Sequence, residues 1–512
     1  MSFDRVTRRA YRRGRLPLDK LAVGLMGLLL ALSGFLVLLG DHAVARVQTF
    51  SWESRTVGAE NVAFTLTFTR PMEPDSVADN LTITPDLPGR MSWAGRRMAY
   101  TLDIPVPYGE AYEVSLPAAR DRFADGEQTT QFQPFTGTFQ SRDRAIAYIG
   151  SQGDEAGRLM LINFSQGSDP TALTPTDWQV LSFEPYPLGD RLLFSAVLAR
   201  DRNQGIRNPA LYTAATGLAP LPPAEPTMQT PELATEPADA GTITPVLDSR
   251  VYQNLAFDLA PDGQKIVVQR VNQSDPSDFG PWIIENDVEP RRLDTEPGGE
   301  FLIAPDSQTL LLLQGQGTAI IPLEAGGDEP VTAAPLDFLP EFGRVFDVSR
   351  DGTAAAMVDF NQNDPERRFL ETLVLVTNQG EETPLLDATG SIMSAEFDPT
   401  GRILYVLASE LLPGDDYQEQ PYVAAVPLTE DPTPIKLLDL PAQARVAMDI
   451  APDGLAALIG VTSANSDASN AEQTQTVLLP LFATTEQRLS GTPAAAAPQV
   501  LSLEGTQPTW LP

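Results

Sequence analysis

Short segments in which apolar and polar residues alternate recur along most of the chain. Residues 61–69 read NVAFTLTFT, so an extended strand there would carry four apolar side chains on one face, namely Val62, Phe64, Leu66 and Phe68. Similar segments follow at residues 98–102 and 112–116, with turn-forming residues between them. About seven short strands in so short a region predict a β-sandwich over residues 46–139.

After residue 140 a turn pattern repeats, with its centre at Gly263, Ser307, Gly352, Gly401 and Gly454. The copies are 44, 45, 49 and 53 residues apart, and most read Pro-Asp-Gly or close to it. In such a turn Pro fixes φ, Asp bonds the backbone that follows and Gly accepts positive φ. An alternating strand precedes each turn and a denser apolar strand follows it, with two more strands beyond. Four strands per unit predict the blades of a β-propeller over residues 140–512.

Two fainter units, around Ser141-Arg142-Asp143 and Phe183-Glu184-Pro185, raise the predicted number of blades to seven. The last residues, Thr509 to Pro512, read like an inner strand with no blade behind it, so we expect them to close the ring inside the first blade. Residues 219–245 hold seven prolines and no Lys or Arg. That composition predicts a disordered insertion.

Two stretches resemble known bacterial families. Residues 68–77, FTRPMEPDSV, with Asn80-Leu81-Thr82-Ile83 after them, resemble the start of the Ig-like domain of the SbsA type. Phe397-Asp398-Pro399-Thr400-Gly401 and Leu259-Ala260-Pro261-Asp262-Gly263 resemble the repeats of TolB-like propellers. The first resemblance implies a spacer or adhesion module of exported proteins, and the second implies a role in envelope complexes. Together with the strand pattern, they predict an all-β protein.

The N-terminal region differs from the rest. Leu21 to Gly40 are twenty residues without a charge, long enough for a helix that spans about 30 Å of hydrocarbon. Residues 1–20 hold seven basic groups against two acidic ones. The positive-inside rule then predicts a cytoplasmic N-terminus, a transmembrane helix at residues 21–40 and an extracytoplasmic remainder. A cleaved signal peptide is the alternative, because Ala43-Val44-Ala45 matches a cleavage site.

Charge and composition narrow the chemistry. The chain has 68 acidic and 35 basic residues, a net charge of −33, which makes nucleic acid an unsuitable partner. It has no cysteine and no G-x-S-x-G, and its one histidine, His42, is expected at the membrane end, far from any pocket. Catalysis by a thiol, an imidazole or a nucleophile-elbow serine is therefore not expected. Acidic pairs such as Asp154-Glu155, Asp275/Asp278 and Asp415-Asp416 are expected on loops, without EF-hand spacing. We therefore predict no catalytic residues, no metal site and no cofactor.

Two hypotheses for function follow from these observations. The first is a non-enzymatic protein-interaction platform of the bacterial envelope, held at the membrane by Leu21 to Gly40, that binds an unknown envelope protein or peptide. The alternative is a carbohydrate-active or cell-wall-binding enzyme that uses a carboxylate pair in the propeller channel. Trp178, Trp282 and Trp510 are expected to pack within the blades rather than bind sugars.

Overall fold

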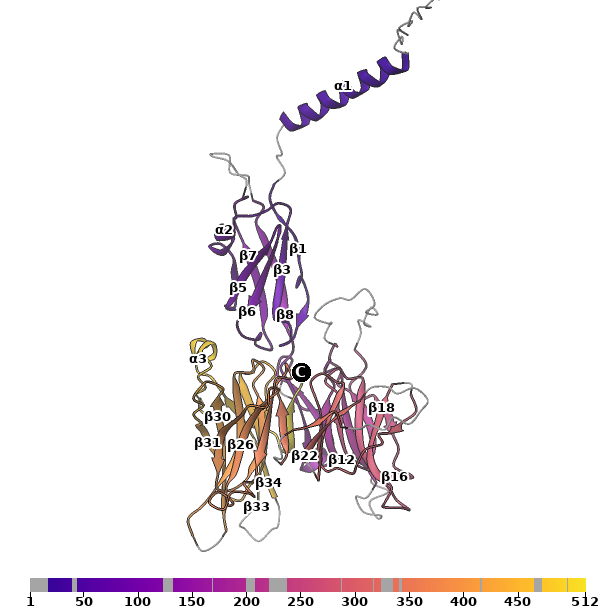
Figure 1. Ribbon diagram of the computed structural model, residues 1–512, viewed down its shortest axis with the longest axis vertical. Helices are drawn as coiled ribbons and strands as arrows, with labels where there is room; N and C mark the ends of the chain where they lie inside the picture. The colour runs from indigo at the N-terminus through magenta and orange to yellow at the C-terminus, as the bar shows by residue number, and fades with distance from the viewer. Residues whose placement is uncertain are drawn as a thin grey trace, which may run out of the picture.

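A computed structural model describes residues 17–38, 44–122, 132–167, 169–198, 208–220, 237–286, 288–315, 317–323, 335–339, 343–414, 417–464, 472–494 and 496–512. Over these residues the protein is mostly β, as the sequence predicts, and the strands form nine four-stranded sheets (Figure 1). His42, Asp415, Asp416, Ala43 of the candidate cleavage site, residues 1–16 and residues 221–236 of the predicted insertion lie outside the described residues.

Two of the sheets form a sandwich with one shared core. The first has the order β1-β3-β6-β5, with strands β1 (Val47–Phe50), β3 (Ala63–Phe68), β6 (Arg97–Leu102) and β5 (Gly89–Ala94). The second has the order β2-β8-β7-β4, with strands β2 (Thr56–Val57), β8 (Phe135–Ser141), β7 (Ala111–Leu116) and β4 (Thr82–Thr84). A short helix, α2 (Pro74–Ala78), carries the buried Val77 of this core.

The core of the sandwich is rich in aromatic rings. Phe64, Leu66 and Phe68 of β3 are fully buried, and the ring of Phe64 stacks on Tyr100 with 5.1 Å between centroids. The prediction that Val62 shares this buried face is wrong, because Val62 is 56% exposed. Val62 stands just before the first residue of the strand; its carbonyl still accepts the N–H of Leu102 at 2.8 Å, but its side chain is not held against the core.

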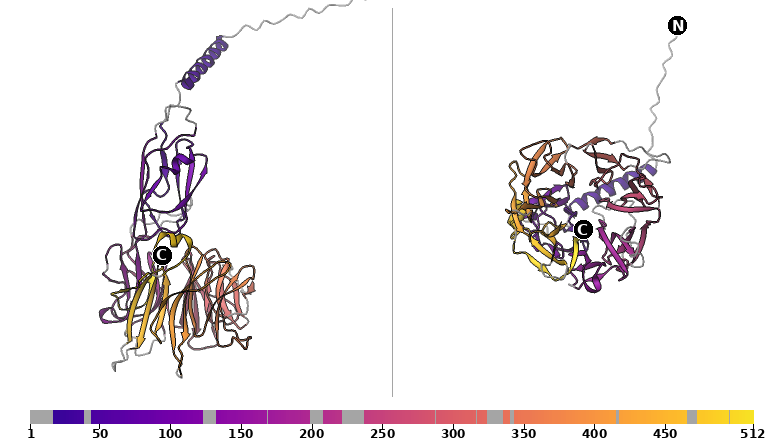
Figure 2. Two further views of the ribbon diagram at one scale, coloured as in Figure 1. Left: turned by 90° about the vertical axis from the view of Figure 1, so that its left-hand side faces the viewer. Right: turned by 90° about the horizontal axis from the view of Figure 1, so that it is seen from below.

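The other seven sheets stand around a common axis as the blades of a propeller (Figure 2). We number the blades in chain order and give the strands from the inside outward. Blade 1 consists of β36 (Gly505–Trp510), β9 (Ala145–Gly150), β10 (Leu159–Asn163) and β11 (Thr171–Ala172). Blade 2 consists of β12 (Trp178–Pro185), β13 (Arg191–Leu198), β14 (Ala210–Ala215) and β15 (Ile243–Leu247). Blade 3 consists of β16 (Tyr252–Leu259), β17 (Lys265–Asn272), β18 (Phe279–Glu285) and β19 (Arg291–Arg292).

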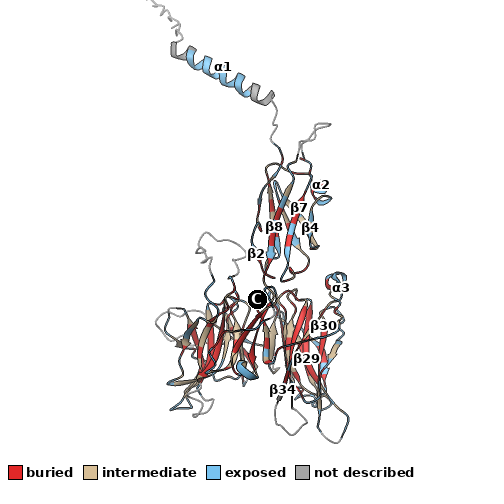
Figure 3. Ribbon diagram, turned by 180° about the vertical axis from the view of Figure 1, so that it is seen from behind, coloured by how far each residue is buried: buried red, intermediate tan, exposed pale blue. Residues whose placement is uncertain are grey.

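The later blades repeat the same order of strands. Blades 4 and 5 consist of β20 (Phe301–Ile303), β21 (Thr309–Gln314), β22 (Gly317–Pro322), β23 (Asp337–Phe338); and β24 (Val345–Val348), β25 (Ala354–Asp359), β26 (Glu371–Thr377), β27 (Glu382–Ala388). Blades 6 and 7 consist of β28 (Ile392–Phe397), β29 (Ile403–Leu411), β30 (Glu419–Pro427), β31 (Ile435–Asp439); and β32 (Arg445–Ile450), β33 (Ala456–Ala464), β34 (Glu472–Pro480), β35 (Gln499–Leu501). The second strand of each blade is almost wholly buried (Figure 3).

The repeated turn adopts the predicted geometry. Gly263, Gly352, Gly401 and Gly454 have φ between 67° and 71°, and Ser307 takes the same left-handed conformation at 56°. In each turn the residue at this position donates its N–H to the carbonyl three residues back, as Gly263 does to Ala260 at 2.7 Å. Asp453 shows the expected side-chain contact, since its Oδ1 accepts the N–H of Leu455 at 3.0 Å.

The chain closes the ring as predicted. Strand β36 pairs antiparallel with β9, so residues from the C-terminus supply the innermost strand of blade 1. Trp510 and Leu511 are 4% and 0% exposed, and Trp510 joins a core shared by blades 7 and 1. The expectation that Trp510 packs within the blades is thereby confirmed.

Polar contacts, two of them buried and one exposed, join the sandwich to one end of the propeller. The N–H of Tyr108 donates to Asp453 Oδ2 at 3.0 Å, and Arg488 Nη2, in the short helix α3 (Thr485–Ser490), donates to the carbonyl of Pro105 at 2.9 Å. Arg350 of blade 5 pairs with Glu60 at 3.1 Å. These contacts lie at the turns that follow the innermost strands, so we name this end proximal and the opposite end distal.

A separate helix, α1 (Pro17–Leu38), covers most of the predicted membrane segment. It lies away from both β domains in Figure 1, and the apolar side chains described on it are exposed, as Leu21 at 71% and Leu30 at 73% show. Within the described residues no helix has both the length and the apolar character needed to cross a bilayer, so the structure does not support the predicted transmembrane helix. The predicted sidedness stays a prediction.

Candidate functional site

A cavity of about 370 Å³ lies between the innermost strands of blades 3, 4 and 5. Phe257, Phe301 and Phe346 line it, and each stands two residues before the end of its strand, so the repeat brings three rings to one level of the ring of blades. Glu300 and Arg344, which precede β20 and β24, place the cavity toward the distal end. We name it the distal cavity. Its size is in the range of small-molecule sites.

One buried side chain of the distal cavity, Gln269, has an acceptor atom without a hydrogen-bond partner among the described residues. Gln269 of β17 is 4% exposed, and its Nε2 donates to the carbonyl of Gly298 at 3.2 Å. Its Oε1 lies within the cavity wall with almost no accessible surface, and among the described residues it accepts no hydrogen bond, so a ligand would reach it by a small movement of the side chain. A buried acceptor without a partner costs about 1–3 kcal/mol, so a donor that reaches Oε1 would be bound favourably.

A charged pair completes the wall of the distal cavity. Arg344 Nε lies 2.9 Å from Glu300 Oε2, and the guanidinium of Arg344 stands 5.0 Å from the centre of the Phe346 ring. Both side chains are about half exposed, so the pair is screened and free to exchange partners. The cavity thus combines aromatic walls, a buried acceptor, a cation and a single carboxylate.

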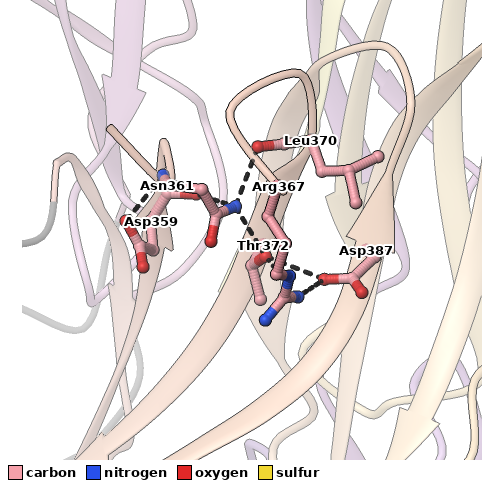
Figure 4. A network of polar contacts seen from close by, with 6 residues as sticks. All are labelled: Asp359, Asn361, Arg367, Leu370, Thr372 and Asp387. Carbon is pink, nitrogen blue, oxygen red and sulfur yellow. Dashed lines mark hydrogen bonds and ion pairs between the residues drawn. The ribbon is translucent and has the colours of Figure 1, made fainter. Parts of the chain in front are cut away.

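A polar network joins strands and the connection at the distal rim of blade 5 (Figure 4). Asn361 Nδ2 donates to the carbonyl of Leu370 at 2.8 Å and to Thr372 Oγ1 at 2.9 Å. Thr372 in turn donates to Asp387 Oδ1 at 2.8 Å. The network fixes the connection that begins at Phe360, and the ring of Phe360 covers Gly343 so closely that a Cβ there would lie 2.2 Å from it. Arg344 is the next residue, so the network positions it indirectly.

Elsewhere in the propeller, five carboxylates join one blade to the next. Each stands one residue before the end of an innermost strand and accepts the N–H of the last residue of the next blade's innermost strand. The pairs are Glu184 with Leu259, Asp258 with Ile303, Asp347 with Phe397, Glu396 with Ile450, and Asp449 with Trp510. We name these contacts the carboxylate links.

Burial changes the acidity of the linking carboxyls. It raises the pKa of Asp258 and Asp347 to about 6 and that of Asp449 to about 7. Burial, followed by the charge of a neighbouring carboxylate, also raises the pKa of Glu184 and Glu396. Among the described residues these five are the only Asp and Glu side chains with a raised pKa, and each bonds a main-chain N–H of the next blade. None of the five lines the distal cavity. The predicted sugar-hydrolysing carboxylate pair in the propeller channel stays a prediction.

The other acids singled out in the sequence have local roles. Glu155 accepts the hydroxyl of Tyr148 at 2.9 Å, Asp275 accepts the N–H of Ser277 at 3.1 Å, and Asp278 accepts the hydroxyl of Tyr252 at 2.6 Å. Among the described residues, no three His, Asp or Glu side chains gather closely enough to hold a metal ion. The sequence did not predict Gln269 or Arg344 as site residues. A strand pattern marks neither a buried acceptor that lacks a partner nor a cation that meets residues of another blade.

Comparison with known proteins gives a fold likeness only. No family model and no curated protein matches the chain, so the resemblance to SbsA-type and TolB-like families stays a prediction. Among solved structures it is similar to a prolyl endopeptidase (11% identity, TM-score 0.41, 78% of this chain and 49% of that one) and to a puromycin hydrolase (15%, 0.40, 84% and 58%). It is also similar to prolyl oligopeptidase B from Galerina marginata (8%, 0.42, 84% and 52%). The chain therefore spans about half the length of these proteins.

The prediction of a non-enzymatic interaction platform is wrong in the light of these structures. It took the propeller without a catalytic motif as a sign that the protein is no enzyme, yet the similar solved chains named above are two prolyl peptidases and a puromycin hydrolase, all of them enzymes. At these identities and TM-scores the likeness brings no activity and no catalytic residue to this chain, so function has to be argued from its own site.

Proposed function

We propose that the distal cavity binds a ligand group that carries an aromatic ring next to an N–H donor, as an aromatic amide does. The observation that carries the proposal is Gln269 Oε1, a buried acceptor without a partner in a cavity lined by three phenylalanines. The rings offer offset or edge-to-face contacts with an aromatic ligand, and the N–H would satisfy Oε1. Arg344 is placed to bind a ligand carbonyl or carboxylate at the same time.

A small amide tests the cavity directly. N-acetyl-L-phenylalaninamide has the ring, the N–H donors and a carbonyl, and we expect it to bind the full chain in isothermal titration. Replacing Gln269 with Leu keeps the volume and removes the acceptor, so the dissociation constant should rise about tenfold, since an unpaired N–H costs on the order of 1–3 kcal/mol.

Gln314→Leu is the matched control for this experiment. Gln314 is also buried with an unpartnered Oε1, but it does not line the distal cavity. Its replacement should leave the affinity for the amide unchanged. Equal losses in both variants, or no binding to the unmodified protein, would refute the assignment of the site.

We further propose that α1 attaches the protein to a lipid bilayer. Its described side chains from Leu21 to Leu32 include eight large apolar residues that are at least 51% exposed and touch neither β domain. Exposed apolar surface of this extent indicates a partner, and the basic residues before it suit anionic headgroups.

Flotation with anionic liposomes tests this attachment. The full chain should float with the lipid, whereas the double variant Leu25→Asp and Leu28→Asp should stay in the dense fraction, because each Asp costs roughly 3 kcal/mol in the hydrocarbon. The control makes the same change at two exposed leucines of the propeller, Leu336→Asp and Leu411→Asp, and should float. A wild-type chain that does not float contradicts the proposal.

A further inference from the structure

The junction between blades 4 and 5 has no carboxylate link. At the position where blades 2, 3, 5, 6 and 7 carry an acid, blade 4 carries Leu302. The N–H of Val348, which would receive such a link, bonds instead to Oδ1 of its own neighbour Asp347 at 2.8 Å. The junction of blades 1 and 2 also has none, but there the receiving residue is Pro185, which has no N–H to bond.

The same junction has no shared core among the described residues. At the six other junctions a buried apolar cluster contains side chains from both blades. At this one the cluster of Ala355, Met357, Val374 and Val376 belongs to blade 5, and Leu339, from the connection between the blades, is its one member from outside. The apolar contact that holds neighbouring blades together is therefore weaker here.

Cavities occupy both ends of the face that blade 4 turns toward blade 5. The distal cavity takes in Leu302, Leu311 and Leu313 of that face. A second cavity of about 380 Å³ lies toward the proximal end, between Leu311 and Ile320 of blade 4 and Val348 and Ala355 of blade 5. Side chains at a cavity lose the dispersion contacts that they would have in a packed interior.

From these three observations we infer that the propeller ring opens between blades 4 and 5. Among the described residues this junction lacks both the link and a shared core and has a cavity at each end, whereas each of the other six keeps a shared core. Opening there separates walls of the distal cavity, because Phe301 lies on one side of the junction and Phe346 on the other. The junction is thus the route by which a ligand group too large for the cavity mouth enters the cavity. This route rests on the proposed function, whereas the separation of the two blades does not.

Distances between spin labels measure the opening directly, since the chain has no cysteine of its own. Labels at Phe338→Cys and Glu382→Cys place one probe on the exposed outer strand of blade 4 and one on that of blade 5. The control pair, Asp439→Cys and Val500→Cys, spans blades 6 and 7, which have a link and a shared core. We expect a distance distribution about twice as wide for the first pair, with a tail to longer distances. Equal widths would overturn the inference.

A link can also be installed. Leu302→Asn places a side-chain carbonyl where the other blades carry one, so the distribution across blades 4 and 5 should become narrower than in the matched variant Leu302→Ala, which offers no acceptor. A distribution in Leu302→Asn as wide as in Leu302→Ala contradicts the role of the missing link. If either variant does not fold, the comparison of the two label pairs in the unmodified ring still decides the question.

Discussion

Removal of residues 505–512 should abolish the cooperative melting of the propeller or lower its melting temperature by about 10 °C or more. The deletion takes out β36, the innermost strand of blade 1, together with the buried Trp510 and Leu511. Losing two large buried apolar side chains costs roughly 2–5 kcal/mol each, against a typical total of about 5–15 kcal/mol for a folded protein. Asp449 also loses the Trp510 N–H that it accepts, so the last carboxylate link disappears.

Calorimetry of the full and shortened chains measures this effect. Deleting Pro512 alone is the control. Pro512 lies beyond β36, so its removal should leave the melting temperature unchanged. A synthetic peptide of residues 504–512 should restore the transition of the shortened chain if the strand acts by pairing with β9. An unchanged melt after the deletion shows that the ring does not depend on its C-terminal closure.

The closure of the ring could be predicted from sequence because it depends on strand pattern and turn chemistry. Thr509-Trp510-Leu511 alternates like an inner strand, and the seven units left the first blade one strand short. The left-handed residue of each turn was also predictable, since Gly263 and Gly454 stand where only positive φ reverses the chain so tightly. Ser307 shows that the turn tolerates a residue with a Cβ when the rest of the pattern is intact.

The acids of the carboxylate links recur at one position of the repeat, and this recurrence was not used in predicting the strands. In Phe257-Asp258-Leu259 and Phe346-Asp347-Val348 the apolar residues predict the strand, and the acid between them looks like the exposed alternate position. In a propeller that alternate position faces the next blade, so the acid keeps only part of its exposure and meets a main-chain donor. An alignment of the repeats would have shown the acid in five units.

The distal cavity could not be predicted, for a physical reason. Gln269, Glu300 and Arg344 lie in three different blades, and their meeting depends on how the blades pack around the axis. Whether Gln269 Oε1 has a partner depends on atoms that are distant in sequence. The weak junction of blades 4 and 5 could not be predicted either. Leu302 is an ordinary strand residue by itself, and only comparison with the acids at the same position of the other blades shows that a link is missing.

The propeller should be more stable at pH 5 than at pH 8. The linking acids have pKa values raised by burial, to about 6 for Asp258 and Asp347 and about 7 for Asp449, whereas an unfolded Asp titrates near 3.9. The folded protein therefore holds more protons than the unfolded chain between about pH 4 and pH 7, and stability falls as pH rises through that window. The acids with lowered pKa values, such as Asp278 and Asp351, are ionised in both the folded and the unfolded state from pH 5 to pH 8, so they do not affect this comparison.

Asp449→Asn isolates one of these groups. The amide keeps an oxygen for the N–H of Trp510 and cannot ionise, so at pH 8 the variant should be more stable than the wild type by up to roughly 4 kcal/mol, the equivalent of a shift of about three pKa units. At pH 5 the wild-type carboxyl is already protonated, so the two proteins should melt alike. Because Glu396 feels the charge of Asp449, its own ionisation should also become easier in the variant. Asp278→Asn, at a partly exposed acid with a lowered pKa, is the control and should gain nothing at pH 8. Parallel stability curves for Asp449→Asn and the wild type across this range would show that the buried carboxyl carries no charge cost, and the links would then be ordinary hydrogen bonds.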